Sequence, residues 1–460
     1  MDTVAIVGAG PAGLFAAHEL AQNGFDVKIF DMGKPVSERD HADPFDLLHG
    51  MGGSGTFSDG KVNFHPEVGG NLLDFLDEGE AWELVSHIEG IFTQYGVEII
   101  PTNEVQTRGL ERQAAKCGVR FLPIRQAHIG SDHLTELIQR FGDDLRQLGV
   151  RFRFGTRVVD IVCEGRKVKG FTLEGGEFVG ADFVLLAPGR VGSEWMKRIA
   201  ESHSLIYTHN PIDLGVRVEV PSIVMEEIIE ICYDPKFYMR TPTYDDRVRT
   251  FCVSPQGFVV KEVYGDEGVV GVNGHSLRDK KSANTNFALL ASVNLTEPVE
   301  STTAYGLSIA QLATTIGGGK PILQSLGDLR SHRRSTWGRL RKSPGDVIPT
   351  LTDVTPGDIS MALPHRITTN LLEGLEMLAG VIPGLDADRT LLYALELKRY
   401  ARRVETDRNL QTEISGLYVA GDGAGVARGI GGAPATGEIA ARGIIAAHNA
   451  CNGDAPFSVG

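Results

Sequence analysis

The alternation of apolar and polar residues near the N-terminus predicts a strand, a helix and a second strand. Val4–Val7 is a continuous apolar run, as expected for a strand covered on both faces of a parallel sheet. A helix is expected from Pro11 to Gln22, because Pro at an early helical position costs no hydrogen bond. Asp26–Asp31 then supplies a strand, and this order predicts an α/β fold built on a parallel sheet.

Later patterns extend this sheet. Apolar residues at helical spacing predict a helix from Ser131 to Leu148, with Ser131 and Asp132 as caps. Residues 151–187 contain a run of strands separated by turns, and its last apolar stretch is typical of a buried sheet. Near the end of the chain, Gly416–Ala420 reads as a strand, and an Ala- and Ile-rich helix is expected from Ala435 to His448.

The middle of the chain mixes strand and helix patterns, and this mixture predicts an inserted domain. Strand patterns at Leu214–Val220, Phe258–Val263 and Val269–Val272 alternate there with helical ones. We therefore expect a Rossmann-type domain that is interrupted by an α+β substrate or cap domain. The expected boundaries are 1–195 for the first part, 196–370 for the insertion and 371–460 for the return.

Composition narrows the class of protein. The 460 residues carry a formal net charge of −14, which argues against a general nucleic-acid binder and against DNA as a partner. The five cysteines are scattered without a CxxC motif or metal-ligand spacing, so no metal and a reducing, cytoplasmic location are expected. No apolar run approaches the ~20 residues that a membrane span requires, and the oligomeric state stays open.

Gly8-Ala9-Gly10-Pro11-Ala12-Gly13 has the GxGxxG spacing, directly after the first strand and at the start of the helix. In this context Gly8 allows a sharp turn, Gly10 lets backbone N–H groups approach a pyrophosphate, and Gly13 lets helix and strand pack closely. Asp31 ends the second strand near the required spacing and is expected to accept hydrogen bonds from ribose hydroxyls. The unit predicts a dinucleotide site.

Two further segments distinguish FAD from NAD. Thr412–Asp422 ends in a strand followed by Gly421-Asp422, and it resembles the late motif of glutathione-reductase-like flavoproteins. Asp182–Gly189 resembles the strand of that superfamily that ends in Ala-Thr-Gly, here with Pro188 in place of Thr. The resemblance implies a glutathione-reductase-like FAD-binding domain, in which Asp422 binds the ribityl chain or the pyrophosphate edge of FAD.

The loop His49–Lys61 is more particular, and it resembles the signature of a poorly characterised family of NAD(P)/FAD-dependent oxidoreductases, also called FAD-dependent dehydrogenases. Similar stretches recur in order along nearly the whole chain, at 125–132, 212–221, 249–257, 272–276 and 425–437. The resemblance implies FAD and an oxidoreductase, but no particular substrate. Residues 52–56 offer successive N–H donors to the pyrophosphate or the flavin ring, and residues 429–433 offer them to the flavin N1–O2 edge.

Motifs and resemblance together give a set of residues expected to bind FAD. They are Gly8, Gly10, Pro11, Ala12, Gly13, Asp31, Met32, Arg39, Gly53, Ser54, Gly55, Thr56, Val158, Ala187, Gly189, Gly421, Asp422, Gly431, Gly432 and Ala433.

Missing motifs restrict the chemistry. The sequence has no second strand–GxGxxG–helix unit, so NADPH or NADH would serve only as a transient reductant at the flavin, unless electrons come from the substrate or a partner. No CxxxxC pair is present, which excludes a disulfide reductase. Candidate acids or bases are His275, His128 and Lys398, although a structural role is the commoner one for such residues.

A basic stretch at residues 331–342 stands out in this acidic chain. It is interpreted as a solvated face, as a site for an anionic substrate or NADPH, or as a docking site for RNA or protein. The favoured function is a flavin-dependent dehydrogenase or reductase that acts on a small organic molecule by hydride transfer. The alternative is an electron-carrying or macromolecule-binding flavoprotein that uses residues 331–342.

Overall fold

A computed structural model describes residues 2–58, 60–264, 268–277, 280–295, 301–341, 345 and 347–452, with the side chains of Ser131, Asp132, Cys451 and Asn452 left aside. The chain forms two compact units. The first contains Met1–Ile100, Arg125–Asn210 and Ala401–Gly460, and the second contains Pro101–Ile124 and Pro211–Tyr400. Each unit has its own apolar core.

The first unit is built on a five-stranded parallel sheet with the order β22-β10-β1-β2-β6. The central strand β1 is buried along Val4–Val7, as the apolar run predicted. The bounds of these strands are Thr3–Val7 for β1, Asp26–Phe30 for β2, Arg151–Arg153 for β6, Phe183–Leu186 for β10 and Leu417–Val419 for β22. This is a Rossmann-like arrangement within a mixed α/β fold.

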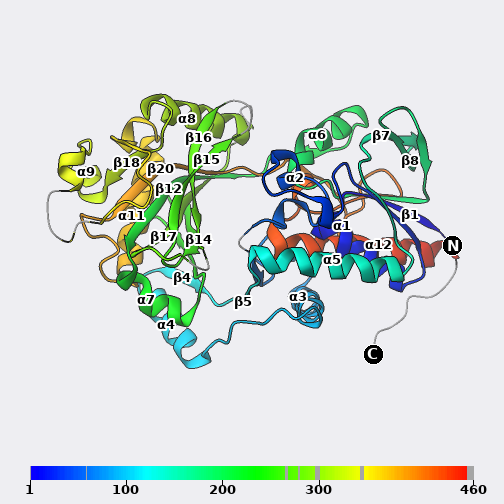
Figure 1. Ribbon diagram of the computed structural model, residues 1–460, viewed down its shortest axis with the longest axis horizontal. Coiled ribbons are helices and arrows are strands. Elements are labelled where there is room, and N and C mark those ends of the chain that lie inside the picture. The colour runs from blue at the N-terminus through cyan, green and yellow to red at the C-terminus, as the bar shows by residue number, and fades with distance from the viewer. Residues whose placement is uncertain are drawn as a thin grey trace. The chain divides into compact units, whose positions relative to one another are not determined.

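Helices and a small sheet cover the parallel sheet (Figure 1). Helix α1 packs closely against α12, because Gly437 leaves no room for a side chain between it and the backbone of Ala12. The three-stranded sheet β7-β8-β9 places Phe171 edge-on against Phe30 of β2. The bounds are Pro11–Gln22 for α1, Pro44–Leu48 for α2, Glu78–Gln94 for α3, Ser131–Gln147 for α5, Ser193–Ser202 for α6, Gly429–Asn452 for α12, Val158–Glu164 for β7, Lys167–Leu173 for β8 and Phe178–Gly180 for β9. Two short antiparallel pairs complete the unit: β3 (Lys61–Phe64) with β5 (Arg125–His128), and β11 (Tyr207–Thr208) with β21 (Arg403–Val404).

The second unit is α+β, with an eight-stranded, mainly antiparallel sheet in the order β19-β18-β20-β12-β17-β14-β13-β4. The strands are β4 (Val119–Leu122), β12 (Ile212–Pro221), β13 (Lys236–Arg240), β14 (Arg247–Ser254), β17 (Asn284–Val293), β18 (Ile322–Ser325), β19 (Thr355–Pro356) and β20 (Leu391–Lys398), with a separate hairpin of β15 (Phe258–Tyr264) and β16 (Val269–His275). The helices are α4 (Glu104–Lys116), α7 (Ser222–Ile231), α8 (Thr302–Ile316), α9 (Leu326–Arg330), α10 (Trp337–Leu340) and α11 (His365–Ala379).

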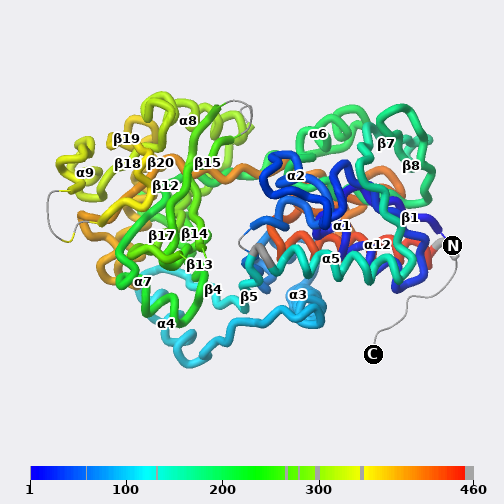
Figure 2. Tube along the Cα trace, viewed as in Figure 1, coloured from blue at the N-terminus to red at the C-terminus, as the bar shows by residue number. Residues whose placement is uncertain are grey.

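The boundaries of the two compact units differ from the expected division into 1–195, 196–370 and 371–460. Residues 101–124 belong to the second unit because β4 pairs with β13, an excursion traced in cyan in Figure 2. The second unit also extends to Tyr400, since β20 pairs with β12 and β18.

Local predictions also differ in detail from the structure. The run of strands predicted over residues 151–187 contributes to two sheets: β6 and β10 belong to the parallel sheet, and β7, β8 and β9 form the small sheet. Helix α12 begins at Gly429 rather than at Ala435, and it contains Pro434. Among the described residues, no helix is both long and apolar enough to cross a membrane.

Candidate cofactor site

The turn between β1 and α1 and the first turn of α1 contain three glycines, and the space available for a side chain differs among them. Gly8 has φ +109°, and a Cβ there would lie 2.2 Å from the carbonyl oxygen of Ala187. A Cβ at Gly13 would lie 2.0 Å from the carbonyl oxygen of Gly8. Gly10, in contrast, has an ordinary φ of −76°, and no described atom lies within 4 Å of its Cβ position. The protein's own packing therefore does not explain Gly10, whereas close approach of a ligand would.

Asp31 braces this turn from the end of β2. Its two carboxylate oxygens accept hydrogen bonds from the backbone N–H groups of Ala9 and Gly33, each at 2.8 Å. A carboxylate oxygen has a second lone pair, so the expected bonds from ribose hydroxyls remain available. Thr156 N donates to the Asp31 carbonyl oxygen at 2.9 Å, which brings the segment before Val158 alongside. Val158 itself is buried in β7, and Met32 is partly exposed directly after Asp31.

The loop of residues 50–56 lies against the turn. Gly52 N donates to the carbonyl oxygen of Ala9 at 2.8 Å, and a Cβ on Gly53 would lie 3.4 Å from the Cα of Gly10. On its other side, a Cβ on Gly55 would lie 3.3 Å from the Ile430 side chain at the start of α12. Ser54 lies between these glycines in a single 3-10 turn, Gly53–Gly55. The loop thus joins the β1–α1 turn to the beginning of α12.

Arg39 fixes the shape of the loop through hydrogen bonds from its buried guanidinium. It is buried, with 8% of its surface exposed, and its guanidinium makes five hydrogen bonds at 2.6 to 3.0 Å, three to the loop and two to Asp46 in α2. The acceptors are the carbonyl oxygens of Asp46, Met51 and Gly53 and the hydroxyl of Thr56. Burial lowers the pKa of Arg39 to about 10. The side chains of Arg39 and Thr56, both expected to touch the cofactor, are therefore engaged in shaping the loop.

The ends of β10 and β22 add the C-terminal part of the site. Gly189, after Ala187 and Pro188, has φ +66° and open space at its Cβ position. Gly421 has φ +75°, and a Cβ there would lie 3.2 Å from the Cβ of Ala12 in the first turn of α1. Asp422 follows, and its carboxylate lies 3.2 Å from Nε of Arg190. Both resemblance motifs thus lie at the same edge of the parallel sheet as the β1–α1 turn.

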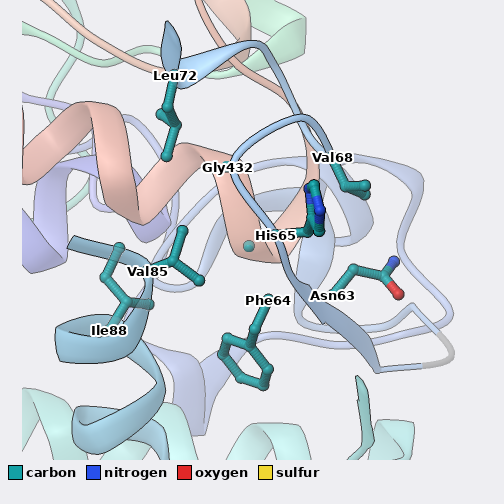
Figure 3. A pocket seen from close by; sticks show the side chains of 9 residues that line it. Asn63, Phe64, His65, Val68, Leu72, Val85, Ile88 and Gly432 are labelled. Atoms are coloured by element: carbon teal, nitrogen blue, oxygen red, sulfur yellow. The ribbon is translucent and has the colours of Figure 1, made fainter. Parts of the chain in front are cut away.

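The first turns of α12 pack against β3 and against the segment that follows it (Figure 3). A Cβ on Gly431 would lie 2.5 Å from the carbonyl oxygen of Asn63, and one on Gly432 would lie 1.7 Å from that of Gly69. Beside Gly432 lies a pocket that also involves Asn63, Phe64, His65, Val68, Leu72, Val85, Ile88 and Gly431. Packing against these carbonyl oxygens therefore already explains why residues 431 and 432 are glycine. The flavin contact expected of them and of Ala433 stays a prediction.

Taken together, the residues of this region fit a dinucleotide. The turn at Gly10, the loop at Gly53, the edge at Gly421 and the start of α12 converge at one end of the sheet. Helix α1 begins at Pro11 with no side-chain cap, so its first N–H groups are available to an anion. The open space at Gly10 is where a pyrophosphate would approach the backbone.

The candidate acids and bases are distributed over both units. His128 lies on β5 of the first unit, opposite Lys61 of β3. His275 ends β16 in the second unit, opposite Phe258. Lys398 ends β20 and forms an ion pair with the buried Glu396 at 3.1 Å. This ion pair is consistent with a structural role for Lys398.

The basic stretch is partly neutralised inside the second unit. Arg333 and Arg339 both contact the same oxygen of Asp328, at 2.6 and 3.2 Å. Arg341 lies over the Trp337 ring at 4.6 Å. Lys342, which also belongs to the stretch, lies outside the described residues. Two arginines of this stretch thus pair with an acidic residue of the same unit.

Two contributors to the site escaped sequence reasoning. Thr436 is buried, accepts from Gly421 N at 3.0 Å and donates to the Ala433 carbonyl oxygen, so it ties the Gly421 turn to α12. Arg190 pairs with Asp422 across 232 residues of sequence. A Thr in the motif GAPATG and an Arg after a glycine turn carry no local signal of these contacts.

Comparison with known proteins identifies the family. Residues 3–260, more than half of the chain, match the model of the FAD dependent oxidoreductase family. Residues 211–399 match the model described as FAD-dependent protein, C-terminal domain-like. An uncharacterized protein of Clostridium beijerinckii is 25% identical over 481 residues, which cover 96% of this chain and 80% of that protein.

Solved structures similar to this chain include an oxidase and a dehydrogenase. Glycine oxidase from Bacillus cereus is 15% identical, with 97% of this chain and 96% of that chain covered and a TM-score of 0.37. The 3-ketosteroid-delta4-(5alpha)-dehydrogenase from Rhodococcus jostii is 14% identical, with 96% of both chains covered and a TM-score of 0.45.

Proposed function

The chain belongs to the FAD dependent oxidoreductase family, and on that premise we propose that it transfers a hydride between FAD and a small organic substrate. The motif order favours a place among glutathione-reductase-like flavoproteins within this family. Membership makes the protein an FAD-dependent enzyme, whereas the substrate and the site residues belong to the proposal.

Gly10 is the observation that carries the proposed cofactor site. Its backbone conformation is open to any residue and no described atom lies within 4 Å of its Cβ position, so nothing in the described part of the chain requires glycine there. A pyrophosphate that approaches the N–H groups of this turn does require it, because a side chain would occupy the same space.

The chain's own residues would then hold and orient the cofactor. Backbone N–H groups from Gly10 onward and the start of α1 would bind the pyrophosphate. Asp31 and Asp422 would accept hydrogen bonds from the ribose and ribityl hydroxyls. When bound, FAD supplies a ring that accepts or releases a hydride. The N-terminal end of α12 would stabilise negative charge near Ala433 through its backbone dipoles.

A nicotinamide cofactor would act as a transient reductant. The sequence has no second GxGxxG unit to bind it, so NADPH or NADH would meet the flavin directly. His128 is proposed as a proton donor or acceptor, since it lies in the unit that contains the cofactor site. The competing function, a carrier that docks through residues 331–342, loses support because Asp328 already pairs with two of those arginines.

The first experiment is an anaerobic visible spectrum of the purified protein, before and after NADPH, NADH and then a panel of small organic acids, amines and alcohols. The proposal expects a flavin spectrum that one of these compounds bleaches, with the oxidised spectrum restored by an acceptor. A protein that contains FAD but is bleached by none of them, and only by a protein reductant, would refute the small-substrate proposal in favour of the carrier.

A further inference from the structure

Three residues that could bind a metal ion lie close together in the first unit, and none of them belongs to the β1–α1 turn. They are Glu19 in the last turns of α1, His87 in α3 and Glu438 in α12. One ligand atom of each residue lies within 4.8 Å of the others. Three separate helices therefore bring one imidazole and two carboxylates to a single point.

Glu438 provides an independent sign that this point takes a ligand. Its side chain is completely buried, and no described residue donates a hydrogen bond to its Oε1 atom. Its other oxygen, Oε2, lies 3.4 Å from Nε2 of His87 and 3.2 Å from Nη2 of Arg442. A buried carboxylate oxygen without a partner is costly, so a bound cation or water is expected to satisfy it.

We propose that Glu19, His87 and Glu438 bind one divalent transition-metal ion of the zinc class. Zinc accepts imidazole nitrogen and carboxylate oxygen at about 2.0–2.2 Å, which in a tetrahedron separates neighbouring ligand atoms by about 3.4 Å. His87 Nε2 and Glu438 Oε2 already lie at this separation, 3.4 Å, and a water bound to the ion would donate to the unpartnered Oε1. Three protein ligands leave a fourth position for water. The imidazole selects zinc, cobalt or nickel over magnesium and calcium, which prefer oxygen ligands.

Arg442 sets the charge balance at the site. Its Nε lies 3.9 Å from Oε1 of Glu19, and its Nη2 contacts Glu438, so one guanidinium faces two carboxylates. With neutral His87, the cluster keeps one uncompensated negative charge. The Arg442 side chain is half-exposed. It can therefore turn toward solvent when a cation binds, and its removal should strengthen metal binding.

Such an ion would connect the helices that begin at the cofactor site. α1 starts at the Gly10 turn and α12 starts at Gly429, and the two helices pack together along their length (Figure 1). An ion held by Glu19, His87 and Glu438 would join both to α3. It would thus stabilise the first unit whether or not FAD is bound, and this inference does not depend on the proposed reaction.

The test uses tag-free, chelator-treated full-length protein at about pH 8, well above the ordinary pKa of imidazole, because the hydrogen bond to Glu438 raises the pKa of His87. Isothermal titration with Zn²⁺ should show one site per chain, and Co²⁺ should give the visible bands of a four-coordinate ion. His87→Ala should weaken binding about tenfold or more and abolish those bands. His41→Ala, which removes a histidine with 85% of its side chain exposed elsewhere in the same unit, should change neither.

Two further variants keep the proposal falsifiable if one of them folds poorly. Glu438→Gln should lose Zn²⁺ binding, whereas Arg442→Gln should bind Zn²⁺ more tightly because it removes the competing cation. Zn²⁺ should also raise the melting temperature of the wild type but not of His87→Ala. Wild type without Zn²⁺ binding, or with binding that His87→Ala leaves unchanged, would overturn the site. Weaker binding in Arg442→Gln would instead assign the cluster to an ion-pair network.

Discussion

Replacing Arg39 tests how the glycine loop is held in shape. Arg39→Met keeps the length of the buried stem but removes all five N–H donors that bind Asp46, Met51, Gly53 and Thr56. The carbonyl oxygens of Asp46 in α2 and of Met51 and Gly53 in the loop then lose the donors that the guanidinium supplied. The loop of residues 46–57 is expected to open more often, while the parallel sheet stays intact.

The magnitude follows from those bonds. A buried polar group left unsatisfied costs about 1–3 kcal/mol. The Gly53 carbonyl oxygen keeps the backbone N–H of Thr56 as a donor at 3.3 Å, so the carbonyls of Asp46 and Met51 set an upper range of about 2–6 kcal/mol. Relaxation and water entry lower this figure, and methionine avoids the burial of charge that lowers the pKa of Arg39 to about 10. We expect a net loss of about 3 kcal/mol, which corresponds to a roughly 100-fold rise in the open population of the loop. Lysine has three donors, so the open population of the loop in Arg39→Lys should lie between those of the wild type and of Arg39→Met.

Hydrogen exchange of the FAD-free protein measures this directly. Peptides from residues 46–57 should lose about two orders of magnitude of protection in Arg39→Met, whereas peptides from β1 and β10 should not change. Arg157→Met, which replaces a half-exposed arginine of the same unit, serves as the matched control. Equal protection of the loop in Arg39→Met and wild type would refute the view that Arg39 holds it.

Three further substitutions test other parts of the account. Asp422→Ala should yield largely FAD-free protein, measured as the ratio of flavin to protein absorbance, and a full complement of flavin would contradict its role. Although burial by itself would raise the pKa of Asp213, its ion pair with Arg249 and its hydrogen bonds hold that pKa below the ordinary value, so its contribution to stability is present above about pH 4 and is lost as the pH falls. Asp213→Asn should therefore lower the free energy of unfolding by about 3 kcal/mol at neutral pH, with a smaller difference near pH 3, in urea titrations. Arg333→Glu should destabilise the second unit by placing a carboxylate beside Asp328, but it should leave flavin reduction unchanged; slower reduction by NADPH would instead favour an anion site in that stretch.

The sequence predicted the first unit best where the signal is local. The strand–turn–helix–strand of residues 3–30 needs only a buried apolar run, an early Pro and glycines at fixed spacing, and α1 has the predicted bounds. The strand β22 before Gly421 was predicted for the same reason. In each case the pattern extends over a few consecutive residues.

Features that depend on distant pairing were missed. The short β4 carries no signal that it joins β13, more than 100 residues later, and so the excursion of residues 101–124 was not expected. The last helix was predicted from Ala435, where the Ala- and Ile-rich pattern begins. In the structure, α12 nevertheless begins at Gly429.

The candidate site shows the same division. Gly10 was predicted from its motif, and its open Cβ position is the kind of geometry that the motif implies. The five bonds of Arg39, and the approach of Glu19, His87 and Glu438, depend on contacts between separate elements. Residue type and spacing alone do not predict such contacts.

The most direct test of the account is FAD binding by Gly10→Val, with Gly90→Val as control. Gly90 lies exposed in α3 of the same unit and, like Gly10, has no described atom within 4 Å of its Cβ position. We predict that Gly10→Val melts like FAD-free wild type but binds FAD at least about 100-fold more weakly, whereas Gly90→Val binds it normally. A Gly10→Val protein that retains wild-type affinity for FAD would contradict the proposed cofactor site.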